Sequence, residues 1–550
     1  MVVLMCLAGL AEGVGVITLV PVLETVESTG RSDGGVSEVV GRIVGLLGLE
    51  PTLPVLLALI VLAITAKAVA LRLANQQIGY TVARVVKDFR ITLMRALLGA
   101  QWSYFIRHRP GQFANAVATE AHRAAFAYRE ACALLAALIQ MTAYLVIAAL
   151  ISLWVAAGTL IVGWGLAVIG RGSFVKSREA GGEQTLSIRE LTARLLDALQ
   201  GIKPIKAMNR EGLVWPLLEN EAEGLNQASR KEVSAAATLQ AFQEPVLALA
   251  LAVGLYIAVQ VSGQSLSSLL VLAFIFYRLV GHISGLQRKY QVMLVGESAF
   301  VSMRDQTEEA LSRQEVSRGV RAFSGLTEAI TFEDVTFGYG ARPVLDGLSL
   351  TIPAGQFVAV HGESGVGKTT LADLLVRLHE PASGRILVDG VPLSELDLSS
   401  WRSAIGYVPQ EILLFHDSIL MNVTLGDPAL DRDDARRALE LAGAWGFVQG
   451  REQGLDATIG STGSMLSGGQ RQRIAIARAL VGKPSLLILD EVTAALDPET
   501  EGAICRTLSE LAGEVTILSI SHQSAMREIA TTVYEMRGGR LELADTSAIA

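Results

Sequence analysis

The sequence predicts a chain of two parts, an all-helical membrane domain of six spans followed by an α/β domain with a phosphate-binding loop. Three observations predict this division. Long apolar runs crowd the first half of the chain, before about residue 290. After about residue 328 the sequence changes to short strand-like segments alternating with helical ones. Within this second part, the stretch from Gly362 to Thr369 matches the pattern G-x-x-x-x-G-K-[ST].

Length and composition agree with a membrane protein of several domains. The chain has 550 residues, too many for one ordinary core. Hydrophobic residues make up 51% and charged residues only 18%, and the mean hydropathy of +0.42 is high for a soluble protein. The net charge of −8 gives no reason to expect nucleic-acid binding. The three cysteines show no metal-binding or pairing pattern and are expected to be apolar filler. No cleavable signal peptide is indicated, because the apolar start lacks a basic leader.

The first part, residues 1–310, is expected to cross the bilayer six times. A span needs about 20 apolar residues. The apolar run from Ala131 to Gly170 is twice that length and is divided near Ser152. The last two spans are separated by a short polar break at 262–265. The expected spans are about 2–23, 53–73, 131–151, 154–170, 245–261 and 266–282.

The distribution of Lys and Arg sets the orientation. Segments 74–130 and 171–242 are rich in both residues and should be cytoplasmic. They also show helical spacing of apolar residues, so spans two to five should continue beyond the bilayer as helical stalks. Two short breaks, His108–Phe113 and Gly201–Glu211, interrupt these stalks. Each is either the place where a soluble motor pushes or an ordinary helical connection.

Ionisable residues in or beside the spans are candidates for function. Glu12, in the middle of the first span, is the clearest, and it either lines a polar pathway or pairs with a basic group of another helix. The same two alternatives apply to the remaining candidates, which are Lys67, Arg72, Glu244, Arg278 and His282.

The second part comprises a linker, 311–328, and an α/β domain, 329–550, expected to contain a largely parallel sheet. Strands are expected at 330–337, 348–352 and 356–360, and a helix at 371–378. In the phosphate loop, backbone N–H groups and the following helix N-terminus would hold phosphate oxygens. Lys368 would reach the β- and γ-phosphates, and Thr369 would bind Mg²⁺. The residues expected to bind nucleotide here are Gly362, Glu363, Ser364, Gly365, Val366, Gly367, Lys368, Thr369 and Thr370.

Two further motifs fit a nucleotide site. The apolar strand from Leu486 to Leu489 ends in Asp490, suited to the Mg²⁺ shell, and Glu491, suited to orient an attacking water. Ser467, Gly468, Gly469 and Gln470 precede a helix expected at 471–480 and form a second anion cradle. This cradle is useful only if a second copy of the domain supplies the nucleotide.

In this order the motifs resemble the nucleotide-binding domain of an ABC transporter. The resemblance implies that Tyr339 stacks on adenine, that Gln410 links the metal site to the membrane domain, and that His522 contacts the γ-phosphate. It also implies that Asp497 belongs to the same series. The whole chain is similar to type I (type IV fold) exporters, and the two stalk breaks look like that family's coupling helices. The chain departs from the family at Ala494, usually Ser, and at 459–463, which lacks the usual Glu before the signature; the N-terminal elbow helix is also missing.

The function predicted from this resemblance is ATP-driven export or flipping of a lipid, a peptide or an amphipathic small molecule. The cofactors would be ATP and Mg²⁺, and the partner a second copy of the chain or a paired half-transporter, with no nucleic acid. The chain would lie in the bacterial plasma membrane with its ATPase domain in the cytoplasm. An alternative is a gating or regulatory membrane protein that uses ATP without moving a substrate.

Overall fold

The computed structural model describes residues 2–19, 21–22, 45, 50, 52–151, 153–262, 266–317, 319–340, 342–460, 465–492 and 498–544. The chain forms two compact units, Met1–Gln314 and Glu315–Ala550, each described here by itself.

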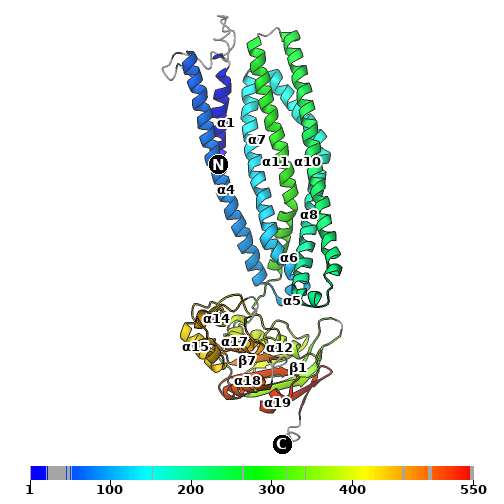
Figure 1. Ribbon diagram of the computed structural model, residues 1–550, viewed down its shortest axis with the longest axis vertical. Coiled ribbons are helices and arrows are strands. Elements are labelled where there is room, and N and C mark those ends of the chain that lie inside the picture. Colours follow the sequence, from blue (N-terminus) through cyan, green and yellow to red (C-terminus); the bar gives the residue numbers. More distant parts are fainter. Residues whose placement is uncertain are drawn as a thin grey trace. The chain divides into compact units, whose positions relative to one another are not determined.

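The first unit is a bundle of long helices (Figure 1). Helix α4 has 46 residues, so it is about 70 Å long, more than twice the thickness of a hydrocarbon core. Helices α8, α10 and α11 have similar lengths, so the helices extend well beyond the bilayer, the sixth included. The helices are α1 (Val2–Ile17), α4 (Leu53–Leu98), α5 (Trp102–Arg107), α6 (Pro110–Asn115), α7 (Ala121–Ile151), α8 (Leu153–Gln200), α9 (Ile202–Ala207), α10 (Glu211–Ser262) and α11 (Leu266–Ser312), with a π-helical turn, η1 (Ala116–Glu120), before α7.

Helix ends occur at both positions where the sequence divides the apolar runs. Helix α7 ends at Ile151 and α8 begins at Leu153; α10 ends at Ser262 and α11 begins at Leu266. Within the described residues, four helices are long and apolar enough to cross a membrane, and these are Leu53–Leu98, Pro110–Val146, Ala156–Gln200 and Glu211–Gly254. A shorter apolar helix covers Val3–Gly15. The full set of six spans stays a prediction.

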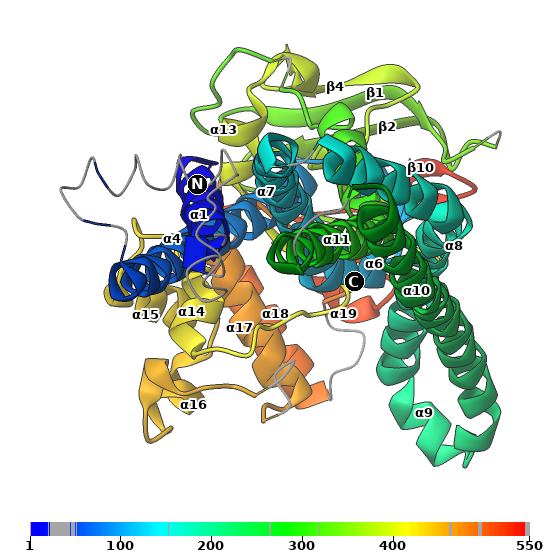
Figure 2. The same cartoon turned by 90° about the horizontal axis from the view of Figure 1, so that it is seen from above.

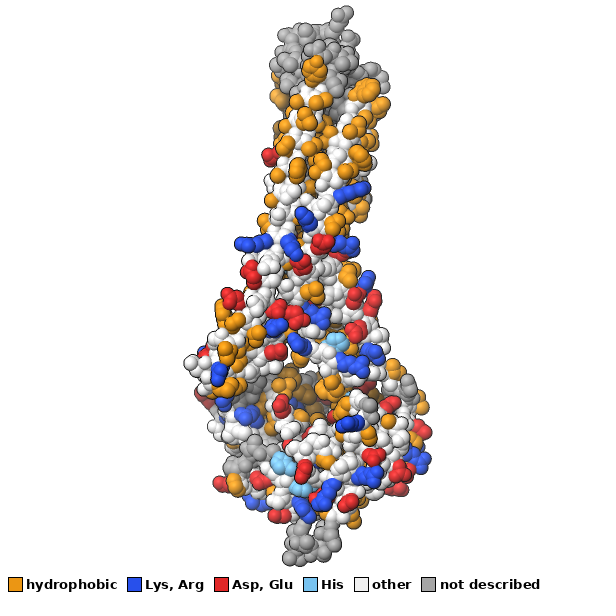
Figure 3. Space-filling model, turned by 90° about the vertical axis from the view of Figure 1, so that its right-hand side faces the viewer, with side chains coloured by type: hydrophobic (Ala, Val, Ile, Leu, Met, Phe, Trp, Pro, Cys, Tyr) orange, Lys and Arg blue, Asp and Glu red, His pale blue; other side chains and the backbone are white. Residues whose placement is uncertain are grey.

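The surface of this unit changes character along the bundle. Apolar side chains cover one stretch of the bundle, and charged side chains gather further along it (Figure 3). The indole side chains of Trp154 and Trp164 are 88% and 71% exposed, as expected where lipid replaces water.

Close helix crossings hold the bundle together around Gly181 and Gly296. A Cβ on Gly181 of α8 would lie 2.3 Å from the carbonyl oxygen of Val295 on α11. A Cβ on Gly296 would lie 2.7 Å from Cβ of Ala127 on α7. Any larger residue at either position would force the helices apart.

The second unit contains two sheets. Six strands form a sheet in the order β10-β9-β3-β8-β7-β6, in which all neighbours are parallel except β9 and β10. A separate antiparallel sheet has the order β2-β1-β4-β5. The strands are β1 (Ala329–Phe337), β2 (Leu345–Pro353), β3 (Phe357–Gly362), β4 (Ser383–Val388), β5 (Val391–Pro392), β6 (Ile405–Val408), β7 (Leu486–Asp490), β8 (Thr516–Ser521), β9 (Thr532–Arg537) and β10 (Arg540–Leu543).

Helices cover both faces of the parallel sheet, whose β7 and β8 are buried along their whole length. The helices are α12 (Lys368–Leu375), α13 (Leu398–Ser403), α14 (Ile419–Thr424), α15 (Arg432–Leu441), α16 (Trp445–Gln449), α17 (Gly468–Leu480), α18 (Pro498–Leu511) and α19 (Ser524–Ile529), with short 3₁₀ turns at η2 (Leu393–Glu395) and η3 (Gly454–Asp456).

Three details differ from the sequence-based expectation. Strands β1 and β2 belong to the separate antiparallel sheet and not to the parallel one. β1 pairs with β2 and β4, both antiparallel, and neither β1 nor β2 pairs with β3. Helix α12 ends at Leu375, not at residue 378, because Arg377 adopts φ +59°. Helix α17 begins at Gly468, not at residue 471, because Ser467 caps it there.

Candidate functional site

The phosphate loop connects the centre of the parallel sheet to a helix. It leaves β3 at Gly362 and enters α12 at Lys368, as the motif requires. Gly367 caps α12 with φ +114°, and a Cβ there would lie 2.9 Å from Leu345. Only glycine fits this backbone and this space.

The side chain of Lys368 is buried inside the loop. Its Nζ donates hydrogen bonds to the carbonyl oxygens of Gly362 and Glu363, both at 2.9 Å. It also lies 3.6 Å from Oε1 of Glu491. The ammonium group is therefore held inside the loop by partners that a phosphate could replace.

Two residues that follow different strands join Lys368 at Glu491. Gln410, after β6, donates from Nε2 to Oε2 of Glu491 at 2.7 Å. His522, after β8, has Nδ1 3.4 Å from Oε1 of the same carboxylate. The carboxyl ends of parallel strands meet at one edge of a sheet, so topology explains why residues distant in sequence meet here. Glu491 itself has φ +50°, an unusual conformation for a residue other than glycine.

Asp490, the preceding residue, is buried and fits a metal ligand. Burial raises the pKa of its carboxyl, while a hydrogen bond from Thr369 opposes the shift; the charges of Glu491 and Asp373 raise it further. Its Oδ1 has no hydrogen-bond partner among the described residues. A buried, unpartnered carboxylate oxygen beside the hydroxyl of Thr369 is the oxygen donor set that Mg²⁺ prefers.

Tyr339 stands at the outer side of the loop. Its ring is 59% exposed and meets Phe337 and His379 edge-on, with centroids 5.2 and 5.3 Å away. Its hydroxyl lies 3.4 Å from Oγ1 of Thr370. An exposed ring that is anchored at its edges offers a face on which a base could stack.

The segment Ser467–Gln470 forms the first turn of α17. Ser467 Oγ accepts from the N–H of Gln470 at 3.2 Å, and Gln470 Oε1 accepts from the N–H of Ser467 at 3.1 Å. Gly469 is required for packing, since its Cβ would lie 2.4 Å from Thr500. Among the described residues no hydrogen bond joins this turn to the phosphate loop, so its roles stay predictions. Asp497, Ala494 and positions 461–464 lie outside the described residues.

Two residues near the site carry no motif signal. Burial, and then the charge of Asp490 and a hydrogen bond to it, raise the pKa of Tyr407, whose hydroxyl therefore stays protonated beside Asp490. Burial also raises the pKa of Asp373 on α12, partly opposed by a hydrogen bond from Tyr339. Residues alternate between the two faces of a strand such as β6, so the sequence could have suggested which face Tyr407 shares but not that it lies beside Asp490.

Comparison with known proteins now decides the family. Residues 345–494 match the family described as "ABC transporter", and residues 1–281 match "ABC transporter transmembrane region". The chain belongs to the ABC transporter family. It therefore binds and hydrolyses ATP in its second unit, coupled to transport by an integral membrane domain in the same chain.

Individual relatives agree. The chain is 31% identical over 501 residues to the ATP-dependent lipid A-core flippase of Burkholderia pseudomallei, covering 86% of this chain and 80% of that protein. It is 30% identical to the heterocyst differentiation ATP-binding protein HepA of Nostoc sp., covering 82% and 74%. The flippase of Chromobacterium violaceum is 33% identical, and the match spans 64% of this chain and 61% of that relative's length. A solved bacterial Atm1-family ABC exporter with ATP bound has the same fold, with a TM-score of 0.82, 24% identity, and coverage of 98% and 94%.

In the membrane unit of the transporter, Glu12 is paired with basic groups. Its carboxylate contacts Nζ of Lys67 on α4 and lies 3.0 Å from Nη2 of Arg278 on α11. The ring of His282 on α11 packs on Tyr144 of α7, with centroids 4.6 Å apart. The Glu12 residue is 4% exposed. The structure contains the interhelical pairing raised as one alternative, and a role of Glu12 in a polar pathway stays a prediction.

The two stalk breaks form short helices. His108 and Arg109 connect helices α5 and α6. A Cβ on Gly111 of α6 would lie 2.9 Å from the backbone of Ala193 on α8, so these two helices pack closely. Helix α9, between α8 and α10, has no buried residue within the first unit. It lies at the far end of the α8–α10 pair (Figure 2).

Proposed function

We propose that the chain works as a homodimer that uses ATP to export or flip an amphipathic lipid. The observation that carries the proposal is the meeting of Lys368, Gln410 and His522 at Glu491, in a chain that also contains a membrane domain. This arrangement places a base, a charge-stabilising ammonium and two polar groups around one point.

In the proposed reaction, Lys368 exchanges the carbonyl oxygens of Gly362 and Glu363 for oxygens of the β- and γ-phosphates. Glu491, released from Lys368, orients the attacking water and accepts its proton. Gln410 and His522 hold the Glu491 carboxylate and the γ-phosphate in register. Tyr339 stacks on adenine.

Asp490, Thr369 and Gln410 are proposed to hold Mg²⁺. The unpartnered Oδ1 of Asp490 supports this assignment. When bound, Mg²⁺ would neutralise phosphate charge. The raised pKa of Asp490 then means that the ion competes with a proton for this oxygen.

A second copy of the chain is proposed to complete each site. The first turn of α17 includes the backbone N–H groups of Gly468 and Gly469 at a helix N-terminus, a position that favours an anion, and among the described residues no hydrogen bond joins this turn to the phosphate loop. Closure of the ATP-binding units of two copies around ATP would then drive the membrane helices. The exposed α9 suits a coupling contact, since Ile202 in it is 41% exposed and Met208 directly after it is 61% exposed. A paired half-transporter could take the place of the second copy.

The proposed substrate is a lipid, and the proposed location is the bacterial inner membrane. The relatives in Burkholderia pseudomallei and Chromobacterium violaceum are named lipid A-core flippases. An apolar bundle whose deeply buried carboxylate is already paired suits a substrate that is mostly hydrocarbon.

Reconstitution tests this proposal. The full-length chain would be inserted in vesicles containing a headgroup-labelled lipid, and the accessible label would be followed after ATP addition. ATP-dependent movement that is absent in Glu491→Gln supports the proposal. If the parent hydrolyses ATP but moves no amphipathic substrate, the result supports the alternative, a gating or regulatory protein.

A further inference from the structure

The two residues at the boundary of the units, Gln314 and Glu315, each make specific contacts within their own unit. On the membrane side, Gln314 donates from Nε2 to the carbonyl oxygen of Ala96 at 2.9 Å, and its backbone pairs with Ala100. On the other side, Glu315 accepts two hydrogen bonds from Arg402, both at 2.7 Å. Two consecutive residues are thus each held by hydrogen bonds within their own unit.

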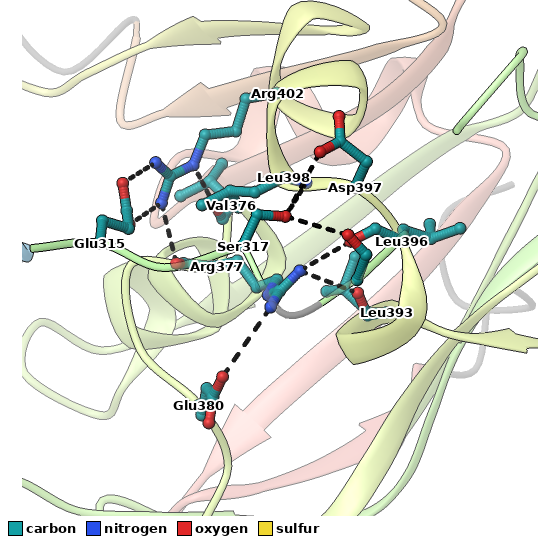
Figure 4. Close-up of polar contacts among 11 residues, drawn as sticks. Glu315, Ser317, Val376, Arg377, Glu380, Leu393, Leu396, Asp397, Leu398 and Arg402 are labelled. Carbon is teal, nitrogen blue, oxygen red and sulfur yellow. Dashed lines mark hydrogen bonds and ion pairs between the residues drawn. The ribbon is translucent and has the colours of Figure 1, made fainter. Parts of the chain in front are cut away.

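Arg402 connects Glu315 directly to the helix that starts at the phosphate loop. Its Nε donates to the carbonyl oxygen of Val376, and its Nη2 to that of Arg377, both at 2.9 Å. Figure 4 shows its guanidinium between Glu315 and these two carbonyls. Val376 is the C-cap of α12 and Arg377 follows it, so both carbonyls lie directly after the helix whose first residue is Lys368.

Neighbouring contacts make this connection stiff. Nε1 of Trp401 donates to the carbonyl oxygen of Leu375 at 2.9 Å, which caps the same helix end. Oγ of Ser317 accepts from the N–H of Leu398 at 3.0 Å, so the chain after Glu315 is also bonded to the first residue of α13. The carboxylate and guanidinium are 29% and 30% exposed, which shields the pair from water and salt.

We propose that Glu315 and Arg402 form a coupling clamp, through which movement of the last membrane helix shifts α12 and with it Lys368. In this role Arg402 and Glu315 are positioning residues, since neither touches the nucleotide. The clamp rests on the proposed function, because it needs an ATP-driven movement to transmit. It also offers a mechanical connection in a chain that lacks the usual Glu before the signature.

The test separates loss of coupling from loss of ATP binding. Glu315→Gln keeps the bonds from Arg402 to α12, so the KM for ATP and the basal ATPase rate should stay within about twofold of the parent, while lipid moved per ATP falls about fivefold or more. Arg402→Gln also uncaps α12, so it should raise the KM for ATP as well. Glu315→Asp should restore part of the coupling.

Gln314→Ala breaks the membrane side of the same connection and should reproduce the effect of Glu315→Gln. Because the two contacts act in series, the double variant should be no worse than either single one. Glu333→Gln is the matched control, since Arg385 donates to Glu333 at 2.6 Å in the same unit without touching α12.

Unchanged lipid movement per ATP in Glu315→Gln would overturn the clamp, as would an equal loss in Glu333→Gln. Hydrogen exchange provides a readout that does not need transport. Glu315→Gln removes the carboxylate that anchors the guanidinium of Arg402, so the retained bonds after α12 should open more often and amide exchange in 368–376 of the ATP-free protein should speed up; an unchanged rate there would also contradict the clamp. If the parent moves no lipid, the proposed function fails, and hydrogen exchange alone decides about the clamp.

Discussion

Two buried carboxylates in this transporter, Glu491 and Glu12, both lie beside basic side chains but on different structural supports. Glu491 lies near a lysine, a glutamine and a histidine, all supplied by loops at strand ends. Glu12 lies between a lysine and an arginine supplied by long helices. Both are largely buried, with side chains 11% and 4% exposed.

The difference lies in what can replace the partners. Around Glu491, Lys368 can turn to phosphate, and the carboxylate is then free to act on water. Around Glu12, no exchange is needed, because two cations already compensate its charge and tie α1 to α4 and α11. In the proposed function, the same chemical group would therefore serve the reaction at Glu491, whereas at Glu12 it joins helices.

The largest expected effect is on activity at Glu491. Glu491→Gln should lower the ATPase rate by about 100-fold or more, because it removes the proton acceptor while keeping the shape of the side chain. ATP binding should persist, which a nucleotide-binding assay on the same sample checks. Hydrolysis at the parental rate would show that Glu491 has no catalytic role.

The matching change at Glu12 should affect stability more than chemistry. Glu12→Gln leaves Lys67 and Arg278 without a counter-charge inside the membrane unit and should cost about 3 kcal/mol. Thermal unfolding in detergent measures this loss. Glu297→Gln, which breaks an exposed pair with Arg178, is the control and should cost under about 1 kcal/mol. Equal losses in both variants would remove the contrast between the two carboxylates.

A smaller, pH-dependent effect is expected at Asp490. Its pKa is raised in the folded state, so its charge opposes folding: the penalty grows as the pH rises from the ordinary pKa of an Asp to the raised folded-state pKa, is complete above that, and disappears in acid, where the carboxyl is protonated in both states. Asp490→Asn should therefore stabilise the nucleotide-free protein by about 1 kcal/mol at neutral pH and by less at low pH, while Mg²⁺-dependent hydrolysis is lost. Melting curves across pH would contradict this if the difference grew on acidification.

A moderate effect, on ATP binding, is expected at the adenine end of the site. Tyr339→Ala should raise the KM for ATP about tenfold, since stacking on an aromatic ring contributes about 1–3 kcal/mol per base. Tyr339→Phe keeps the ring and loses only the hydroxyl contact with Thr370, so its KM should stay near that of the parent. Equal KM values for the Ala and Phe variants would rule out stacking.

Motif spacing predicted the ATP-binding end of the molecule far better than the membrane end. The phosphate loop, Asp490–Glu491 and His522 each follow a strand, so a parallel sheet brings them together without further information. The partners of Glu12 could not be predicted, because they depend on how three helices rotate against one another. The bond between Glu315 and Arg402 was equally invisible, since it joins a linker to a short helix and neither carries a motif.

Mixed dimers test the central claim, that each ATP site combines Lys368 of one copy with Ser467 of another. Copies carrying Lys368→Ala and copies carrying Ser467→Arg should each be inactive alone. Co-expressed in equal amounts, half of the dimers are mixed and contain one intact site, so about a quarter of the parental ATPase rate should return. No recovery in purified mixed dimers, or full activity of either variant alone, would contradict the claim.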